Sequence, residues 1–161
     1  MKEIHLIRHA KSSWDLPLPD HKRPLAQRGI MDAMNVGKSL IEKQLNVEAV
    51  YCSPSERTRQ TADIILNETA LKRLPFHYVD DLYDFHGNGL LSVIKSLPDV
   101  YNSVMVFGHN HAITWFVNNY TSHYFDNVPT CGYLNISFPI SSWNELQKGV
   151  LLNHLFPKDL R

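Results

Sequence analysis

Short apolar runs alternate along the chain with longer segments whose apolar residues fall on one side, and this alternation constrains the fold most strongly. The runs at 3–8, 48–52, 76–79 and 103–108 are typical of strands, the third being the weakest. Segments 30–41, 53–66, 89–97 and 111–120 have the apolar spacing of one-sided helices. Strands that alternate with helices in this way predict a three-layer α/β/α fold with a mostly parallel central sheet.

Two further features refine this expectation. Segments 132–138 and 149–156 should be strands with no helix between them, so we expect an antiparallel edge from the C-terminal strands. The second helix should begin at Ser53, with Ser53 as N-cap, Pro54 at the first helical position and Glu56 completing a capping box. There is no internal repeat and no linker-like stretch, so residues 1–161 are expected to form one domain.

Charge and composition argue against several classes of protein. The 16 Lys and Arg residues balance 16 Asp and Glu residues, whereas nucleic-acid-binding proteins usually carry a basic surplus. Cys52 and Cys131 match neither a disulfide scaffold nor a metal motif and are expected to be buried thiols. No apolar stretch has the length of a membrane span, and the N-terminus lacks a signal-peptide pattern. We therefore expect a cytoplasmic protein with neither nucleic acid nor membrane as partner.

Polar and basic side chains follow three of the expected strands directly. The first strand ends in Arg8 and His9, the second is followed by Arg57 in the first turn of a helix, and the fourth leads into His109 and Asn110. Ligands of open α/β sheets bind at the carboxyl ends of the strands, so these groups should share one crevice. The two histidines and two arginines come without a compensating carboxylate, and this predicts a multiply charged anion, most simply phosphate, as ligand.

The two histidines can take different roles in such a site. A neutral imidazole is a competent nucleophile toward phosphorus and forms a covalent phosphohistidine. A protonated second imidazole would stabilise charge on the phosphoryl oxygens together with the arginines. This chemistry needs no metal ion. His109 and His111 are poorly spaced for joint ligation from one helix face, and no H-E-x-x-H pattern occurs, so no cofactor is expected.

Three segments together resemble the motifs of the histidine phosphatase superfamily, which has the phosphoglycerate mutase-like fold. LIRHAKSSW (6–14) resembles its RHG/RHA signature, SPSERTRQTA (53–62) its second motif, and VFGHNHAI (106–113) the motif with the second histidine. The segments DHKRPLAQRG (20–29), VPTCGYLNISF (128–138), SSWNEL (141–146) and FPKDL (156–160) are similar to the short SixA-type phosphohistidine phosphatases. The resemblance thus covers nearly the whole chain.

The resemblance implies a role for each motif residue. His9 would be the nucleophile, while Arg8, Arg57 and His109 would bind and polarise the phosphate. Two further motif residues, Ser12 and Asn110, would be substrate-binding residues that contact phosphate only indirectly. Larger relatives carry a Trp-Asn pair where this chain has Trp14 and Asp15, so Asp15 departs from that pattern.

A second departure concerns the group that protonates the leaving group. In acid phosphatases of the superfamily a carboxylate follows the second histidine, but Asn110 stands there in this chain. In mutases it lies after the third strand, where Asp81 and Asp84 are candidate general acids, although solvated carboxylates on a turn explain them as well. The P–N bond of phosphohistidine is weak and its imidazole is protonated near neutral pH, so this substrate needs less help from an acid.

Three functions stay open at this point. The first is a metal-independent phosphatase that acts on phosphohistidine in proteins, which suits a chain with little room for a lid. The second is a phosphatase for small phosphate esters, which a carboxylate close to His9 would favour. The third is a phosphate- or phosphoprotein-binding module without turnover, against which the retention of both histidines and both arginines argues. The sequence does not identify the physiological substrate, the partner or the oligomeric state.

Overall fold

The computed structural model describes residues 1–161 and contains one six-stranded sheet with the order β3-β2-β4-β1-β5-β6. The first four strands in this order pair in parallel, whereas β5 is antiparallel to both of its neighbours. The expectation of a mostly parallel sheet with an antiparallel edge is therefore confirmed. The strands are β1 (Lys2–Arg8), β2 (Ala49–Cys52), β3 (Phe76–Tyr78), β4 (Ser103–Gly108), β5 (Tyr133–Phe138) and β6 (Val150–Leu155).

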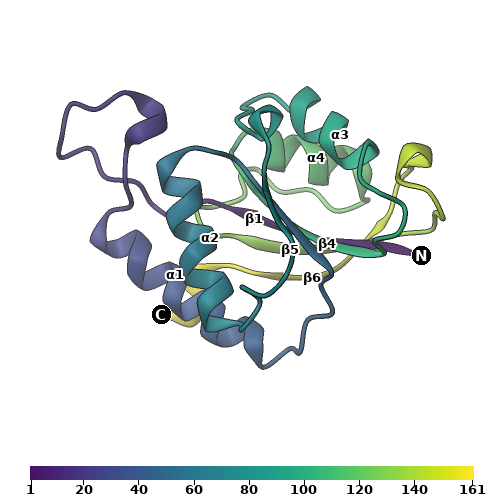
Figure 1. Cartoon of the computed structure of the whole chain (residues 1–161), viewed down its shortest axis with the longest axis horizontal. Coiled ribbons are helices and arrows are strands. Elements are labelled where there is room, and N and C mark those ends of the chain that lie inside the picture. Colours follow the sequence, from purple (N-terminus) through teal and green to yellow (C-terminus); the bar gives the residue numbers. More distant parts are fainter.

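Helices cover both faces of the sheet (Figure 1). One face packs against α1 (Gln27–Ile41) and α2 (Glu56–Glu68), and the other against α3 (Asn88–Lys95) and α4 (Ala112–Tyr120). Short 3-10 helices, η1 (Asp20–Lys22), η2 (Asp80–Leu82), η3 (Trp143–Glu145) and η4 (Pro157–Leu160), lie in the connections. None of the helices has both the length and the apolar character needed to cross a lipid bilayer.

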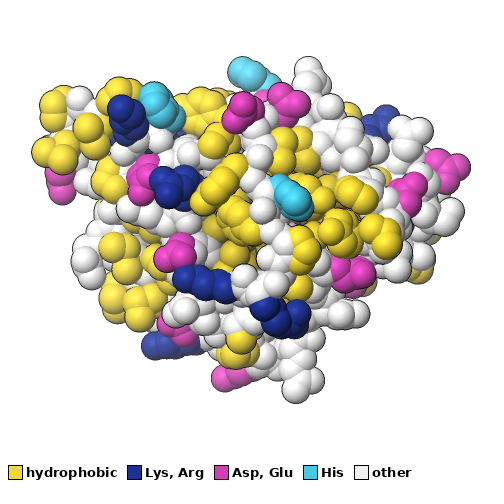
Figure 2. Space-filling view, viewed as in Figure 1, with side chains coloured by type: hydrophobic (Ala, Val, Ile, Leu, Met, Phe, Trp, Pro, Cys, Tyr) yellow, Lys and Arg dark blue, Asp and Glu magenta, His cyan; other side chains and the backbone are white.

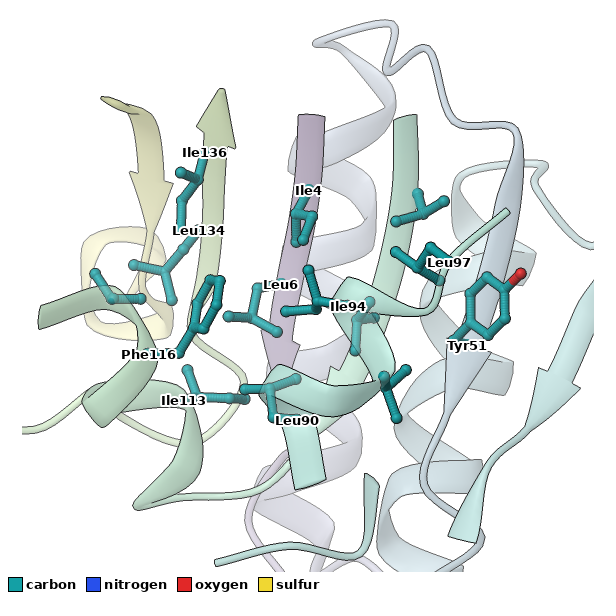
Figure 3. Packing of buried hydrophobic residues seen from close by; sticks show 14 of the residues in the cluster. Ile4, Leu6, Tyr51, Leu90, Ile94, Leu97, Ile113, Phe116, Leu134 and Ile136 are labelled. Carbon is teal, nitrogen blue, oxygen red and sulfur yellow. The ribbon is translucent and has the colours of Figure 1, made fainter. Parts of the chain in front are cut away.

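Two hydrophobic cores lie on opposite faces of the sheet because successive strand residues point to opposite sides. In β1, Ile4 and Leu6 join the core beneath α3 and α4, whereas Ile7 joins the core beneath α1 and α2. Figure 3 shows the first of these cores, in which Leu6 meets Ile94 of α3. The two cores hold β1 from both sides, so its C-terminal end is a rigid place for a functional side chain.

The second helix begins later than the sequence predicts. Ser55 is the N-cap of α2, and it makes no capping hydrogen bond with its side chain. The hydroxyl of Ser53 lies before the helix, where its short contact is to Nε2 of His109 (2.8 Å) and where it accepts a longer bond from the amide of Ser55 (3.4 Å). The expected capping box is also wrong, since the carboxylate of Glu56 instead accepts hydrogen bonds from two residues within the helix, Arg59 and Gln60.

The connection from β1 to α1, residues 9–26, is the longest loop near the carboxyl ends of the parallel strands and is named the β1–α1 loop here. Its base is closed by two backbone hydrogen bonds, from the amide of Ala26 to the carbonyl of Lys11 and from Ser13 to Pro24. Between these points the chain projects away from the body of the protein, as the purple segment of Figure 1 shows.

Candidate active site

His9 follows the last residue of β1 and is held by backbone bonds on both sides. Its amide donates to the carbonyl of Gly108 (3.1 Å), and its carbonyl accepts from Cys131 (2.9 Å). The ring Nδ1 lies 2.7 Å from the carbonyl oxygen of Ala10. Because a carbonyl only accepts, Nδ1 carries the proton and Nε2 keeps its lone pair. Burial, opposed by the Ala10 bond and assisted by the nearby arginine charges, lowers the pKa of His9 to about 3.

His109 follows β4 and faces His9 across the gap between neighbouring strands. The ring centroids of His9 and His109 are 5.2 Å apart. Nε2 of His109 lies 2.8 Å from the hydroxyl of Ser53, and the rings of Tyr83 and Phe85 pack against it. Burial, and then the charges of His9 and Arg57, lower the pKa of His109 far below its ordinary value. Both imidazoles are therefore neutral in the free protein at neutral pH.

Arg57 connects the two imidazoles. It lies in the first turn of α2, and its side chain is 3% exposed. Its Nε is 3.4 Å from Nε2 of His9, and its Nη2 is 3.5 Å from Nδ1 of His109. The guanidinium thus presents one edge to the ring nitrogens of both histidines, as expected for a group that binds an oxyanion between them.

Arg8 lies beside this pair at the end of β1. Its Nη1 donates to the carbonyl of Val128 (2.7 Å), while its buried Nε has no hydrogen-bond partner. Burial, and then the positive charge of Arg57, lower the pKa of Arg8. A buried donor without a partner is costly, so this arginine has binding capacity left for an anion. The structure thus brings together all four residues that the sequence placed at the strand ends.

The structure also places a carboxylate in this site, so the expectation of a site without one is wrong. Asp20 in η1 lies 2.9 Å from Arg57 and 3.2 Å from Arg23. Partial burial alone would raise the pKa of Asp20, but hydrogen bonds from Tyr83, Arg57 and Arg23 outweigh it and hold the pKa well below its usual range. Asp20 is therefore ionised and is a counter-charge rather than a proton donor.

Arg23 is a second residue that the sequence analysis did not select. It is 6% exposed, and its guanidinium lies 3.5 Å from the centroid of the Trp14 ring. It donates to the hydroxyl of Ser12 (2.8 Å). The signal for Asp20 and Arg23 was present in the DHKRPLAQRG segment, where an acidic and a basic residue stand three positions apart.

The remaining candidate residues differ in position. Ser12 and Asn110 both line the pocket above His9. The side-chain oxygen of Asn110 is already bonded to Thr114, which fits the expectation of an indirect role. Asp84 caps α3, since its carboxylate accepts the amides of residues 86, 87 and 90, and Asp81 is exposed; neither lines the pocket. Neither aspartate is therefore placed as a general acid by this geometry.

The pocket has a volume of about 440 Å³ and a basic, polar lining. Its lining residues are Arg8, His9, Lys11, Ser12, Trp14, Asp20, Arg23, Arg57, Phe85, Asn110 and Thr130. A larger hollow of about 550 Å³ lies between α1 and α2 and contains no histidine, so the chemistry belongs to the smaller pocket. No group of three or more His, Cys, Asp or Glu side chains is arranged to hold a metal ion.

Solved structures of other proteins share this fold. Solved structures with the same fold include the putative phosphohistidine phosphatase SixA from Agrobacterium tumefaciens, with a TM-score of 0.79 and 21% identity over 97% of this chain and 98% of that one. Another is the protein histidine phosphatase SixA complexed with tungstate, with a TM-score of 0.80 and 17% identity over 99% of both chains. At these identities the likeness establishes the fold.

The sequence comparisons establish the family. The uncharacterized protein Rv1276c of Mycobacterium tuberculosis is 36% identical over 103 residues, which are 64% of this chain and 62% of that protein. The chain thus spans less than two thirds of the length of that curated relative. Residues 4–91 match the histidine phosphatase superfamily (branch 1), and these residues include His9 and Arg57. The chain therefore belongs to the histidine phosphatase superfamily.

Proposed function

We propose that this protein is a metal-independent phosphatase that forms a covalent phosphohistidine on His9 and acts on phosphohistidine in proteins. The observation that carries the proposal is the state of the His9 ring: Nδ1 is tied to a carbonyl, so Nε2 is unprotonated, and it accepts only a long hydrogen bond of 3.4 Å from Nε of Arg57. A fixed, neutral imidazole beside three guanidinium groups suits attack on a phosphoryl group.

Two transfers complete the reaction. In the first, Nε2 of His9 attacks phosphorus, the P–N bond to the substrate imidazole breaks, and that imidazole, already protonated on its other nitrogen, leaves with the electron pair as a neutral ring. Arg57, Arg8 and Arg23 stabilise the charge on the phosphoryl oxygens. In the second transfer, water attacks phosphorus, the bond to His9 breaks, and inorganic phosphate leaves. His109 faces the same centre and becomes a better proton carrier when a dianion raises its pKa.

The choice of phosphohistidine as substrate is supported by the lack of an acid in the pocket. Asp20 is the only carboxylate of the lining and is held ionised by its partners. An alkyl phosphate ester has a poor leaving group and needs a proton donor, whereas an imidazole leaving group is protonated near neutral pH. The SixA structures of the same fold are named as phosphohistidine phosphatases, which agrees with this choice.

The choice of a protein as substrate is supported by the surface next to the pocket. Trp14, Leu16 and Leu18 of the β1–α1 loop are 76%, 62% and 38% exposed. Figure 2 shows hydrophobic side chains gathered over the upper left of the molecule, where Figure 1 places this loop. An exposed apolar cluster beside a reaction site is typical of a surface that contacts another protein.

The test compares His9→Ala with His77→Ala, whose ring is exposed on the edge strand β3 and outside the pocket. Turnover of a phosphohistidine protein should be lost in His9→Ala and kept in His77→Ala, and rapid quenching should trap labelled phosphate on His9. Full activity of His9→Ala would refute the assignment of His9 as the nucleophile. EDTA should leave the rate unchanged. A panel of phosphohistidine protein, phosphoramidate and aryl or sugar phosphates would refute the substrate class if esters were preferred by orders of magnitude.

A further inference from the structure

Asp20 accepts two hydrogen bonds from the guanidinium of Arg57. Nη1 of Arg57 donates to the main-chain carbonyl of Asp20 at 2.7 Å, and Nη2 donates to its carboxylate at 2.9 Å. The same carboxylate accepts bonds from the hydroxyl of Tyr83 and from Nη2 of Arg23. Asp20 therefore ties together the β1–α1 loop, the first turn of α2 and the segment after η2.

A guanidinium has two edges that can bind an anion, and Asp20 takes only one of them. The edge formed by Nη1 and Nη2 faces Asp20. The other edge, formed by Nε and Nη2, faces the rings of His9 and His109 at 3.4 and 3.5 Å. These inner distances are longer than the usual 2.9–3.0 Å of an N–H hydrogen bond, so the inner edge is weakly bonded in the free protein.

We propose that Asp20 is a positioning residue that acts through Arg57: it holds the outer edge of the guanidinium so that the inner edge stays aimed at the phosphoryl group on His9. An arginine side chain has several rotatable bonds and loses much freedom when it is fixed. The two hydrogen bonds to Asp20 fix the side chain of Arg57 before the substrate binds, so binding does not have to supply this loss of conformational entropy. The inference rests on the proposed function of the pocket as a phosphoryl-transfer site.

The charge of Asp20 adds a second effect on the same group. The ionised carboxylate partly neutralises Arg57 and Arg23, and it therefore weakens their attraction for a bound phosphate. Asp20→Asn keeps the main-chain bond and an amide oxygen as acceptor but removes the charge. Asp20→Ala removes the side-chain bond and the charge together. The two variants thus separate the effect of Asp20 on the orientation of Arg57 from its effect on the positive charge of the site.

The activity test is a double-mutant cycle with phosphohistidine protein as substrate. Asp20→Ala should lower kcat/KM by roughly 10–100-fold, mainly through kcat, because aim matters most in the transition state. In an Arg57→Lys background the same change should cost less than about threefold, because lysine has no second edge to aim. A full effect in that background, or none in the wild type, would overturn the proposal. Asp15→Ala is the matched control, since Asp15 is exposed in the same loop and its carboxylate makes no bond.

A binding test can be made even if the protein turns over no substrate. The proposed phosphatase function and the proposed role of Asp20 can therefore fail separately. Calorimetric titration with inorganic vanadate should show affinity that rises several-fold in Asp20→Asn, because two arginines lose their counter-charge. Unchanged or weaker binding would overturn the neutralisation effect. Urea unfolding curves of each variant show whether it is folded. If Asp20→Ala is not folded, Asp20→Ser, which also removes the carboxylate that holds Arg57, takes its place in the cycle. The conservative variant Asp20→Glu should keep most of the wild-type kcat.

Discussion

Three buried histidines should make this protein unusually sensitive to acid. Burial is the largest cause of a lowered pKa for His5, His9 and His109, and the pKa is about 4 for His5 and about 3 for His9. In the unfolded chain each imidazole titrates at its ordinary pKa, about 6.5. Below that pH the unfolded state binds more protons than the folded state, so the free energy of unfolding falls as the pH falls.

The size of the effect follows from these pKa values. Each histidine lowers the free energy of unfolding by about 2 kcal/mol between pH 7 and pH 5, and the three together by about 6 kcal/mol. This is a large part of the 5–15 kcal/mol that is typical of a domain. The loss should be nearly absent at pH 7 and above, where all three rings are neutral in both states, and should grow by about 1.4 kcal/mol per histidine for each pH unit below 6.

Urea unfolding curves recorded between pH 5 and pH 8 would measure this effect. The variant His9→Asn carries one titrating ring fewer, so its loss between pH 7 and pH 5 should be about 4 kcal/mol. The exposed His77→Asn is the control and should run parallel to the wild type. If the curves of His9→Asn and the wild type were parallel over this range, His9 would not be a buried neutral imidazole, and the assignment of its Nε2 as the free nucleophile would lose its basis.

Three further predictions follow from single contacts. Ser53→Ala removes the shortest contact of His109 Nε2, at 2.8 Å, and leaves only the hydroxyls of Ser55 and Thr58 at 3.4 and 3.5 Å, so it should lower kcat about tenfold with little change in KM, as steady-state kinetics would show. Gly29→Ala would bring a Cβ into collision with the main-chain carbonyl of Lys11, so thermal unfolding should reveal a loss of at least about 2 kcal/mol as the base of the β1–α1 loop is forced apart. Leu16→Ala, in the exposed apolar cluster but outside the pocket lining, should reduce kcat/KM several-fold for phosphohistidine protein but not for phosphoramidate, and an equal loss for both would contradict a protein-docking role.

The sequence allowed the sheet and the four residues at its strand ends to be predicted because both depend on local patterns. A strand ends where its apolar run ends, and parallel strands deliver their ends to one edge, so His9 and His109 had to meet. Asp20 was not predicted as a site residue because its position depends on the path of a long loop. That path is set by tertiary contacts, such as Trp14 on Arg23 and the amide of Ala26 on the carbonyl of Lys11, which no short-range pattern reports. The start of α2 was misplaced for a similar reason, since the shortest contact of the Ser53 hydroxyl is to His109, which is distant in the sequence.

The presence of Asp20 changes the electrostatic argument for the ligand. Two protonated histidines and two arginines without a carboxylate would repel one another strongly in the free protein. In the structure both imidazoles are neutral at pH 7, and the three arginines of the pocket face one ionised carboxylate, which leaves a net charge of two positive units apart from the exposed Lys11 at the rim. A phosphoryl group carries up to two negative charges, so the site matches its ligand without a large excess. The match also explains why the histidines are kept neutral by burial: a protonated His9 would add to the charge but would have no lone pair with which to attack phosphorus.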